Sequence, residues 1–117
     1  MSVKGFIEQL SGELQAVFTK ISEEEVEGFV ELVSRANKIF VTGAGRIGTS
    51  SRAFAMRLMH LGKPTYWLVD DTTPSNGEGD LHIANSGSGN TPSTYQYARK
   101  AKDCGTYVAT ITANRER

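Results

Sequence analysis

Cysteine is nearly absent from this sequence. Cys104 is the only cysteine among 117 residues, so the chain cannot form an internal disulfide. That composition is typical of a cytoplasmic protein. No basic residue is arranged beside Cys104, which is therefore predicted to be a small buried side chain rather than a reactive thiol.

The sequence also lacks an excess of charge of one sign and a long apolar run. It has 13 Lys and Arg residues against 13 Asp and Glu residues. A balanced charge disfavours nucleic-acid and anionic-membrane partners, which favour basic proteins. Lys4, Glu8 and Glu13 interrupt the first apolar residues, so the N-terminal region is expected to be neither a signal peptide nor a membrane span.

The remaining pattern alternates helices with short apolar strands. Apolar residues recur at helical spacing from about residue 3 to 20, and Ser22 with Glu25 forms a capping box for a second helix. Further helices are predicted at residues 49–61 and 92–103, and strands at residues 38–42, 65–69, 81–84 and 106–112. The strand at residues 65–69 is apolar and continuous, which predicts burial on both faces.

Strands that alternate with helices indicate right-handed crossovers and a parallel sheet. The predicted fold is an α/β class, three-layer α/β/α sandwich of flavodoxin-like type with strand order 2-1-3-4. Two N-terminal helices precede the sheet, and residues 1–117 are expected to form a single domain.

A loop of small residues follows the predicted strand at residues 81–84. Ser86, Ser88 and Thr91 contribute hydroxyls, while Gly87 and Gly89 allow backbone N–H groups to approach an anion. Thr91 and Pro92 are suited to the first positions of a helix. Because a helix N-terminus favours negative charge, the segment 86–91 is predicted to bind phosphate.

A second loop of similar design follows the strand at residues 38–42. Gly43-x-Gly45-x-x-Gly48 has the dinucleotide-binding spacing, and Asp70 and Asp71 stand roughly where a ribose-binding carboxylate would lie. Arg46 and the hydroxyl run at residues 49–51 instead favour a monophosphate or sugar hydroxyls. Glycines for a tight turn explain Gly43 and Gly45 but not those hydroxyls.

The two histidines have different expected roles. His60 ends a predicted helix and is either a surface or core imidazole or an acid/base group, since histidine titrates near neutral pH. His82 lies within a predicted strand, where a hydrogen-bonded structural role is favoured. No His, Cys or carboxylate cluster has metal-ligand spacing, so no metal site is predicted.

Several strings resemble the 6-phospho-3-hexuloisomerases of the sugar isomerase (SIS) domain family. The resemblance covers about residues 3–112, and one string, Ala53-Phe-Ala-Met-Arg-Leu-Met-His-Leu-Gly62, is specific to that subfamily. The others are Val41-Thr-Gly-Ala-Gly-Arg46, Asp71-Thr-Thr-Pro74, Gly79-Asp-Leu, Ser86-Gly-Ser-Gly-Asn-Thr91 and Ala101-Lys.

The resemblance implies aldose–ketose isomerisation of a hexulose 6-phosphate, from 3-hexulose 6-phosphate to fructose 6-phosphate, through an enediolate and without metal or cofactor. It implies that residues 86–91 hold the phosphate and that Gly45, Arg46 and Ser51 lie at the site. It also implies catalytic roles for His60 and Arg46, with His60 supplied across a subunit interface of a homo-oligomer.

Three differences from the family pattern accompany the resemblance. Ile47 and Asn90 stand where Ser and Glu are common. Family members also continue beyond residue 117 with a fifth strand and a glutamate implied as the main acid/base, so the chain is expected to lack its C-terminal part. Three functions therefore remain: a phosphosugar isomerase, a non-catalytic phosphosugar-sensing module, and a small nucleotide-binding domain.

Overall fold

The computed structural model describes residues 2–68, 77–86 and 92–112. Its internal contacts divide the chain into two compact units, residues 1–31 and residues 32–117. Each unit is described by itself, and the expectation of one domain over residues 1–117 remains a prediction.

The N-terminal unit contains helix α1 (Val3–Phe18) and the first part of helix α2 (Glu23–Arg35). Ser2 caps α1 by accepting a hydrogen bond from the Gly5 N–H, and Ser22 accepts one from the Glu25 N–H as its capping role predicts. None of the residues of α1 is buried. Its apolar side chains therefore face solvent within this unit, although the sequence has an amphipathic pattern there.

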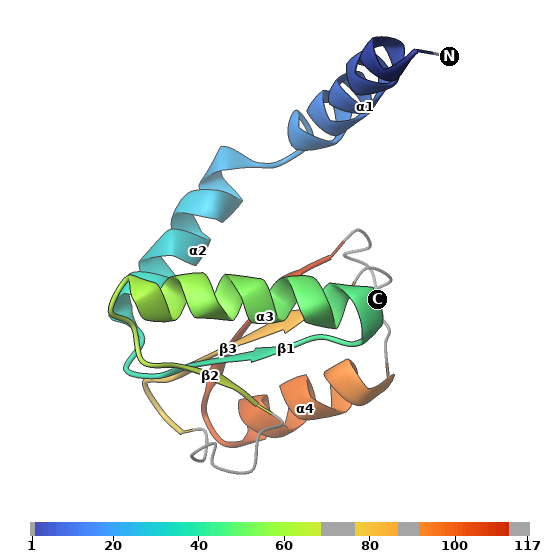
Figure 1. The fold of residues 1–117 in the computed structure, drawn as a ribbon. Coiled ribbons are helices and arrows are strands. Elements are labelled where there is room, and N and C mark those ends of the chain that lie inside the picture. Colours follow the sequence, from blue (N-terminus) through green and yellow to red (C-terminus); the bar gives the residue numbers. More distant parts are fainter. Residues whose placement is uncertain (1, 69–76, 87–91, 113–117) are drawn as a thin grey trace. The chain divides into compact units, whose positions relative to one another are not determined.

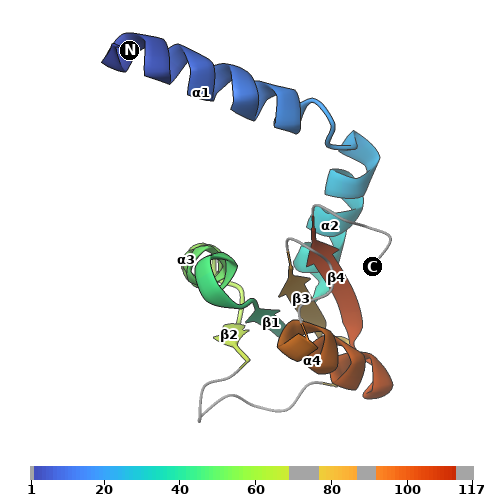
Figure 2. The ribbon, with the colours of Figure 1, turned by 90° about the vertical axis from the view of Figure 1, so that its right-hand side faces the viewer.

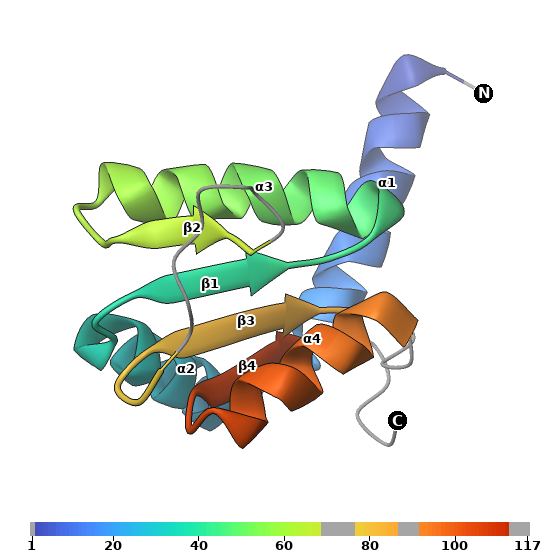
Figure 3. The same ribbon diagram turned by 90° about the horizontal axis from the view of Figure 1, so that it is seen from below.

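The second unit is built on a four-stranded parallel sheet in the order β2-β1-β3-β4, which confirms the predicted topology (Figure 3). The strands are β1 (Ile39–Thr42), β2 (Thr65–Trp67), β3 (Leu81–Asn85) and β4 (Tyr107–Ile111). Helix α3 (Gly45–His60) follows β1, and helix α4 (Pro92–Asp103) follows β3. These two helices lie on opposite faces of the sheet (Figures 1 and 2). The three-layer α/β/α arrangement is therefore confirmed.

The core of this unit lies on the two central strands. Every residue of β1 and β3 is buried, and Ile39, Phe40, Val41 and Ile83 have no exposed surface. Apolar strands covered on both faces by helices are the arrangement that parallel sheets require. The two strands pair in parallel with Ile39 beside Leu81 and Thr42 beside Ala84.

Asp80 ties the two central strands together at their amino ends. Its carboxylate is 3% exposed, and its Oδ1 accepts a hydrogen bond of 3.1 Å from the Lys38 N–H. The Lys38 Nζ lies 3.6 Å from Oδ2. The Gly79-Asp80-Leu81 string therefore has a structural role in this fold, at the edge of the sheet opposite the carboxyl ends of the strands.

Three sequence-based expectations need correction. Strand β2 is half-buried along its length rather than buried on both faces, because it is the edge strand of the sheet next to β1. Helix α3 begins at Gly45, whose φ is 60°, rather than at Thr49, so only Gly43 and Ala44 separate it from β1. Cys104 is exposed, at the turn after α4, and is not a core residue.

Candidate functional site

The candidate site lies where β1 and β3 end side by side. Thr42 pairs with Ala84 at the carboxyl ends of these strands, and the chains then leave toward helices on opposite faces. Such a point in an open α/β sheet is where ligands commonly bind. The structure therefore brings the residues after β1 and the start of the second loop, Ser86, to the carboxyl end of the sheet.

The first loop is shaped by close contact between Gly43 and Gly48. A Cβ on Gly48 would lie 2.8 Å from the Gly43 carbonyl oxygen, and a Cβ on Gly43 would lie 2.9 Å from the Ser51 Oγ. Neither position has room for a side chain. Ala44, which precedes α3, gives the helix no side-chain cap. The first N–H groups of α3 are thus suited to binding an anion at the carboxyl end of the sheet.

Ser51 and Asn85 connect the two loops. The Ser51 hydroxyl donates to the Ile47 carbonyl at 2.7 Å and accepts a hydrogen bond of 2.9 Å from Asn85 Nδ2. Both side chains are buried, and Asn85 Oδ1 has no hydrogen-bond partner among the residues that the structure describes. The single proton of the Ser51 hydroxyl is therefore used within the fold. Ser51, predicted as a substrate ligand, is placed so that it positions the turn.

Asn85 was missed by the sequence interpretation. It ends the apolar strand Leu81–Asn85 and is 7% exposed. A polar residue at the carboxyl end of a buried strand is the signal that would have identified it. Its burial beside Ser51 makes it the contact through which the β3 end and α3 are held together.

The second loop begins at Ser86, which is 6% exposed and whose N–H donates to the Ile111 carbonyl at 3.2 Å. Gly87, Ser88, Gly89 and Thr91, the other predicted phosphate ligands, lie outside the described residues, as do Asp70 and Asp71. Pro92 starts α4 as predicted, directly after that segment. The described flanks thus bring the start of the loop to the candidate site.

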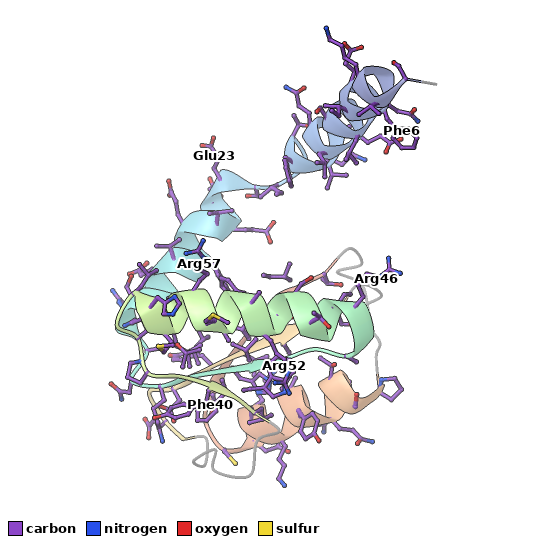
Figure 4. The ribbon with its side chains drawn as sticks, viewed as in Figure 1. Phe6, Glu23, Phe40, Arg46, Arg52 and Arg57 are labelled. Carbon is purple, nitrogen blue, oxygen red and sulfur yellow. The ribbon has the colours of Figure 1, made fainter. Side chains whose placement is uncertain are left out.

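The predicted catalytic residues Arg46 and His60 lie at opposite ends of α3. Arg46 is exposed and extends from the N-terminal end of the helix, away from the sheet (Figure 4). His60 is the last residue of α3 and is also exposed. At 1.5 Å per residue, 14 residues separate these positions by about 21 Å along the helix axis. One chain therefore cannot bring both side chains to the same reacting atom.

A different cation, Arg52, lies beside the sheet. Its guanidinium is 4.6 Å from the centre of the Trp67 ring, at the end of β2 (Figure 4). A Cβ on Gly48 would be 4.0 Å from the same indole. Arg52 and Trp67 thus flank the Gly43–Gly48 contact on the β2 side.

His82 is a structural residue, as the sequence predicts. It has no exposed surface, and its Nε2 is 2.8 Å from the Thr42 Oγ1. Burial disfavours the charged imidazolium and lowers the pKa of His82 from 6.5 to about 4. Within the described part of the chain, its Nδ1 has no hydrogen-bond partner. The ring is therefore neutral in the folded protein at neutral pH.

The described residues contain neither a metal-binding constellation nor a membrane-spanning helix. No group of three His, Cys, Asp or Glu side chains within residues 2–68, 77–86 and 92–112 is arranged to hold a metal ion. Over the same ranges, each helix is too short or too polar to cross a bilayer. The nearby donors are hydroxyls, amides, backbone N–H groups and guanidinium cations, which suit an anionic, hydroxyl-rich ligand.

Comparison with known proteins identifies the class to which this fold and site belong. The family model of the SIS domain matches residues 32–117, and the chain belongs to the SIS domain family. It is 38% identical to the 3-hexulose-6-phosphate isomerase of Bacillus subtilis (strain 168), over 99% of this chain and 63% of that protein. The chain thus spans less than two thirds of the length of this relative.

Solved structures give the same class. A Methanococcus jannaschii protein, whose crystal structure infers a 3-hexulose-6-phosphate isomerase function, has a TM-score of 0.76 and 40% identity. That match covers 80% of this chain and 52% of the other. The Vibrio vulnificus NanR protein complexed with ManNAc-6P has a TM-score of 0.74 and 26% identity, over 91% of this chain and 44% of NanR.

Proposed function

We propose that this chain is the phosphosugar-binding part of an isomerase that interconverts 3-hexulose 6-phosphate and fructose 6-phosphate. The observation that carries the proposal is that β1 and β3 end side by side at the carboxyl end of the sheet, in a chain of the SIS family. The name of the Bacillus subtilis relative supplies the substrate. A cytoplasmic location fits a substrate of this kind.

Both sugars are ketoses, so the proposed reaction moves a ketone from C3 to C2 and is not the aldose–ketose isomerisation expected from the sequence. A base removes the proton from C2 of 3-hexulose 6-phosphate, whose carbonyl is at C3. The enediolate that forms takes a proton at C3 while the carbonyl forms at C2, so no atom is gained or lost. The N–H groups and hydroxyls of residues 86–91 hold the phosphate. A cation or imidazole near the carbonyl oxygen stabilises the enediolate, and His60 is the proposed acid/base group.

Phosphate binding by the second loop gives the first prediction. The Ser86→Ala/Ser88→Ala variant is expected to bind fructose 6-phosphate about 10- to 100-fold more weakly, the scale of hydrogen bonds to a charged group. Isothermal titration calorimetry measures the affinity of the wild type and of the double variant for fructose 6-phosphate. Ser93→Ala is the matched control, because this serine lies on the exposed side of α4. Equal affinities for the wild type and the double variant would contradict the phosphate assignment.

A non-catalytic phosphosugar-sensing module is the second candidate function. The likeness to NanR complexed with ManNAc-6P favours it, because that complex shows a protein of this fold with a sugar phosphate. The two candidates differ in turnover. Fructose 6-phosphate formation from 3-hexulose 6-phosphate supports the isomerase, whereas binding without turnover by the whole protein supports the sensing module. Titration with NAD tests the nucleotide-binding alternative.

A homo-oligomer is proposed because α1 presents an apolar stripe without a partner in its own unit. Val3, Ile7, Leu10, Leu14 and Val17 follow one another at alternating spacings of four and three residues, and each is exposed. That spacing produces a seam that fits another helix. Isolated helices of this length are marginally stable in water, so the seam is expected to pack against a second copy of the chain.

The N-terminal seam gives the second prediction. Leu10→Glu/Val17→Glu places two charges on the seam and is expected to shift the protein to monomers in sedimentation velocity. Gln9→Glu/Ala16→Glu adds the same charges at the same spacing on the adjacent exposed side of α1, and should leave assembly unchanged. An identical distribution for both variants would exclude the seam as the interface.

A further inference from the structure

We propose that Arg52, held by Trp67, binds the end of the sugar that is remote from the phosphate. This inference rests on the proposed function and adds a substrate-positioning cation to the site. It concerns a residue that neither the glycine pattern nor the serine loop identifies.

Arg52 is an oriented cation whose donors are uncommitted in the described residues. Its guanidinium lies over the Trp67 ring at 4.6 Å, a cation–π contact that restricts the positions open to the group. Within residues 2–68, 77–86 and 92–112, no carboxylate forms an ion pair with it and no acceptor takes a hydrogen bond from it. A guanidinium whose positions are already restricted loses less entropy when it binds two neighbouring oxygen atoms.

The place of Arg52 along the sheet matches the length of the proposed substrate. Trp67 is the last residue of β2, while the phosphate loop starts at Ser86, directly after β3. Strands β2 and β3 are both neighbours of β1, so these points are about two strand spacings, or about 10 Å, apart. A six-carbon open-chain phosphate spans such a separation, and a three-carbon phosphate does not.

The other arginines of α3 are less well placed for this contact. Figure 4 shows Arg46 extending away from the sheet at one end of the helix and Arg57 near the other end. Arg52 is the arginine of α3 that contacts an aromatic side chain of the sheet among the described residues. Its N–H groups are therefore assigned to the carbonyl and hydroxyl oxygens at C1 to C3 of the sugar.

Trp67 also provides the measurement, because it is the only tryptophan in the sequence. Fructose 6-phosphate is expected to change its fluorescence, whereas inorganic phosphate and glycerol 3-phosphate bind at the loop without reaching it. In Arg52→Gln, the affinity for fructose 6-phosphate should fall about 10- to 100-fold, as for a lost hydrogen bond to a charged group. The affinities for the two short phosphates should stay the same.

Arg57→Gln is the matched control, since it removes the same charge from another exposed position of the same helix. Arg52→Lys keeps the charge but not the planar group and should restore part of the affinity. Unchanged fructose 6-phosphate affinity in Arg52→Gln, or an equal loss for all three phosphates, would overturn the inference. A wild type that binds phosphate but no sugar phosphate would instead contradict the proposed function, so the two failures are distinguishable.

Discussion

Replacement of His60 by Asn is expected to lower the turnover of the proposed isomerase about 10²- to 10⁴-fold, the usual contribution of an acid/base side chain. The loss should appear in kcat, with little change in KM, because His60 is proposed to transfer a proton rather than to hold the phosphate. The measurement is steady-state formation of fructose 6-phosphate. A change confined to KM would argue for a binding role.

The position of His60 adds a second expected result for the same variant. Since about 21 Å of helix separates it from Arg46, a catalytic His60 must serve the site of a second copy. Mixing His60→Asn with Ser86→Ala/Ser88→Ala should therefore restore activity. In a mixed pair, one site combines the intact serine loop of the His60→Asn chain with the intact His60 of the other chain. The matched control mixes His60→Asn with itself. Failure of mixed oligomers to regain activity would exclude action across the interface.

Acidification is expected to destabilise the sheet unit through His82. The folded-state pKa of about 4 lies below the ordinary 6.5, so the unfolded chain takes up the proton first as the pH falls. The resulting stability is present above pH 6.5 and is lost progressively toward pH 4, by about 3 kcal/mol in total. Denaturant unfolding at several pH values measures this slope.

The comparison for that measurement is Thr42→Val/His82→Leu, which removes both members of the 2.8 Å hydrogen bond together. Its free energy of unfolding should fall less steeply between pH 6.5 and 4 than that of the wild type. The difference in slope isolates the contribution of His82 from that of every other group in the protein. Parallel slopes would show that the histidine does not carry the acid sensitivity.

Much of the fold follows from local sequence signals. The order of the strands came from alternating elements and right-handed crossovers, and α4 begins and ends at the predicted residues, Pro92 and Asp103. The errors have physical causes. Periodicity cannot tell a central strand from an edge strand, so the apolar run at β2 was predicted to be fully buried. The start of α3 at Gly45, whose φ is 60°, could not be predicted from the hydroxyl residues at 49–51.

Only part of the candidate site could be predicted from the sequence. The pairing of the two loops could be inferred because parallel strands end at the same edge of a sheet. The stacking of Arg52 on Trp67 could not, since it depends on the packing of α3 over β2. Ser51 is a similar case, because its hydroxyl is used internally only once Asn85 is placed beside it.

The Ser51–Asn85 hydrogen bond makes the two loops mechanically dependent on each other. Ser51 moves with α3 and the Gly43 turn, whereas Asn85 directly precedes the segment that begins at Ser86. A change in the position of either side chain has to be matched by the other, because this buried contact of 2.9 Å joins them. Substitutions at Ser51 and Asn85 are therefore expected to be non-additive, since each alters both sides of the same contact.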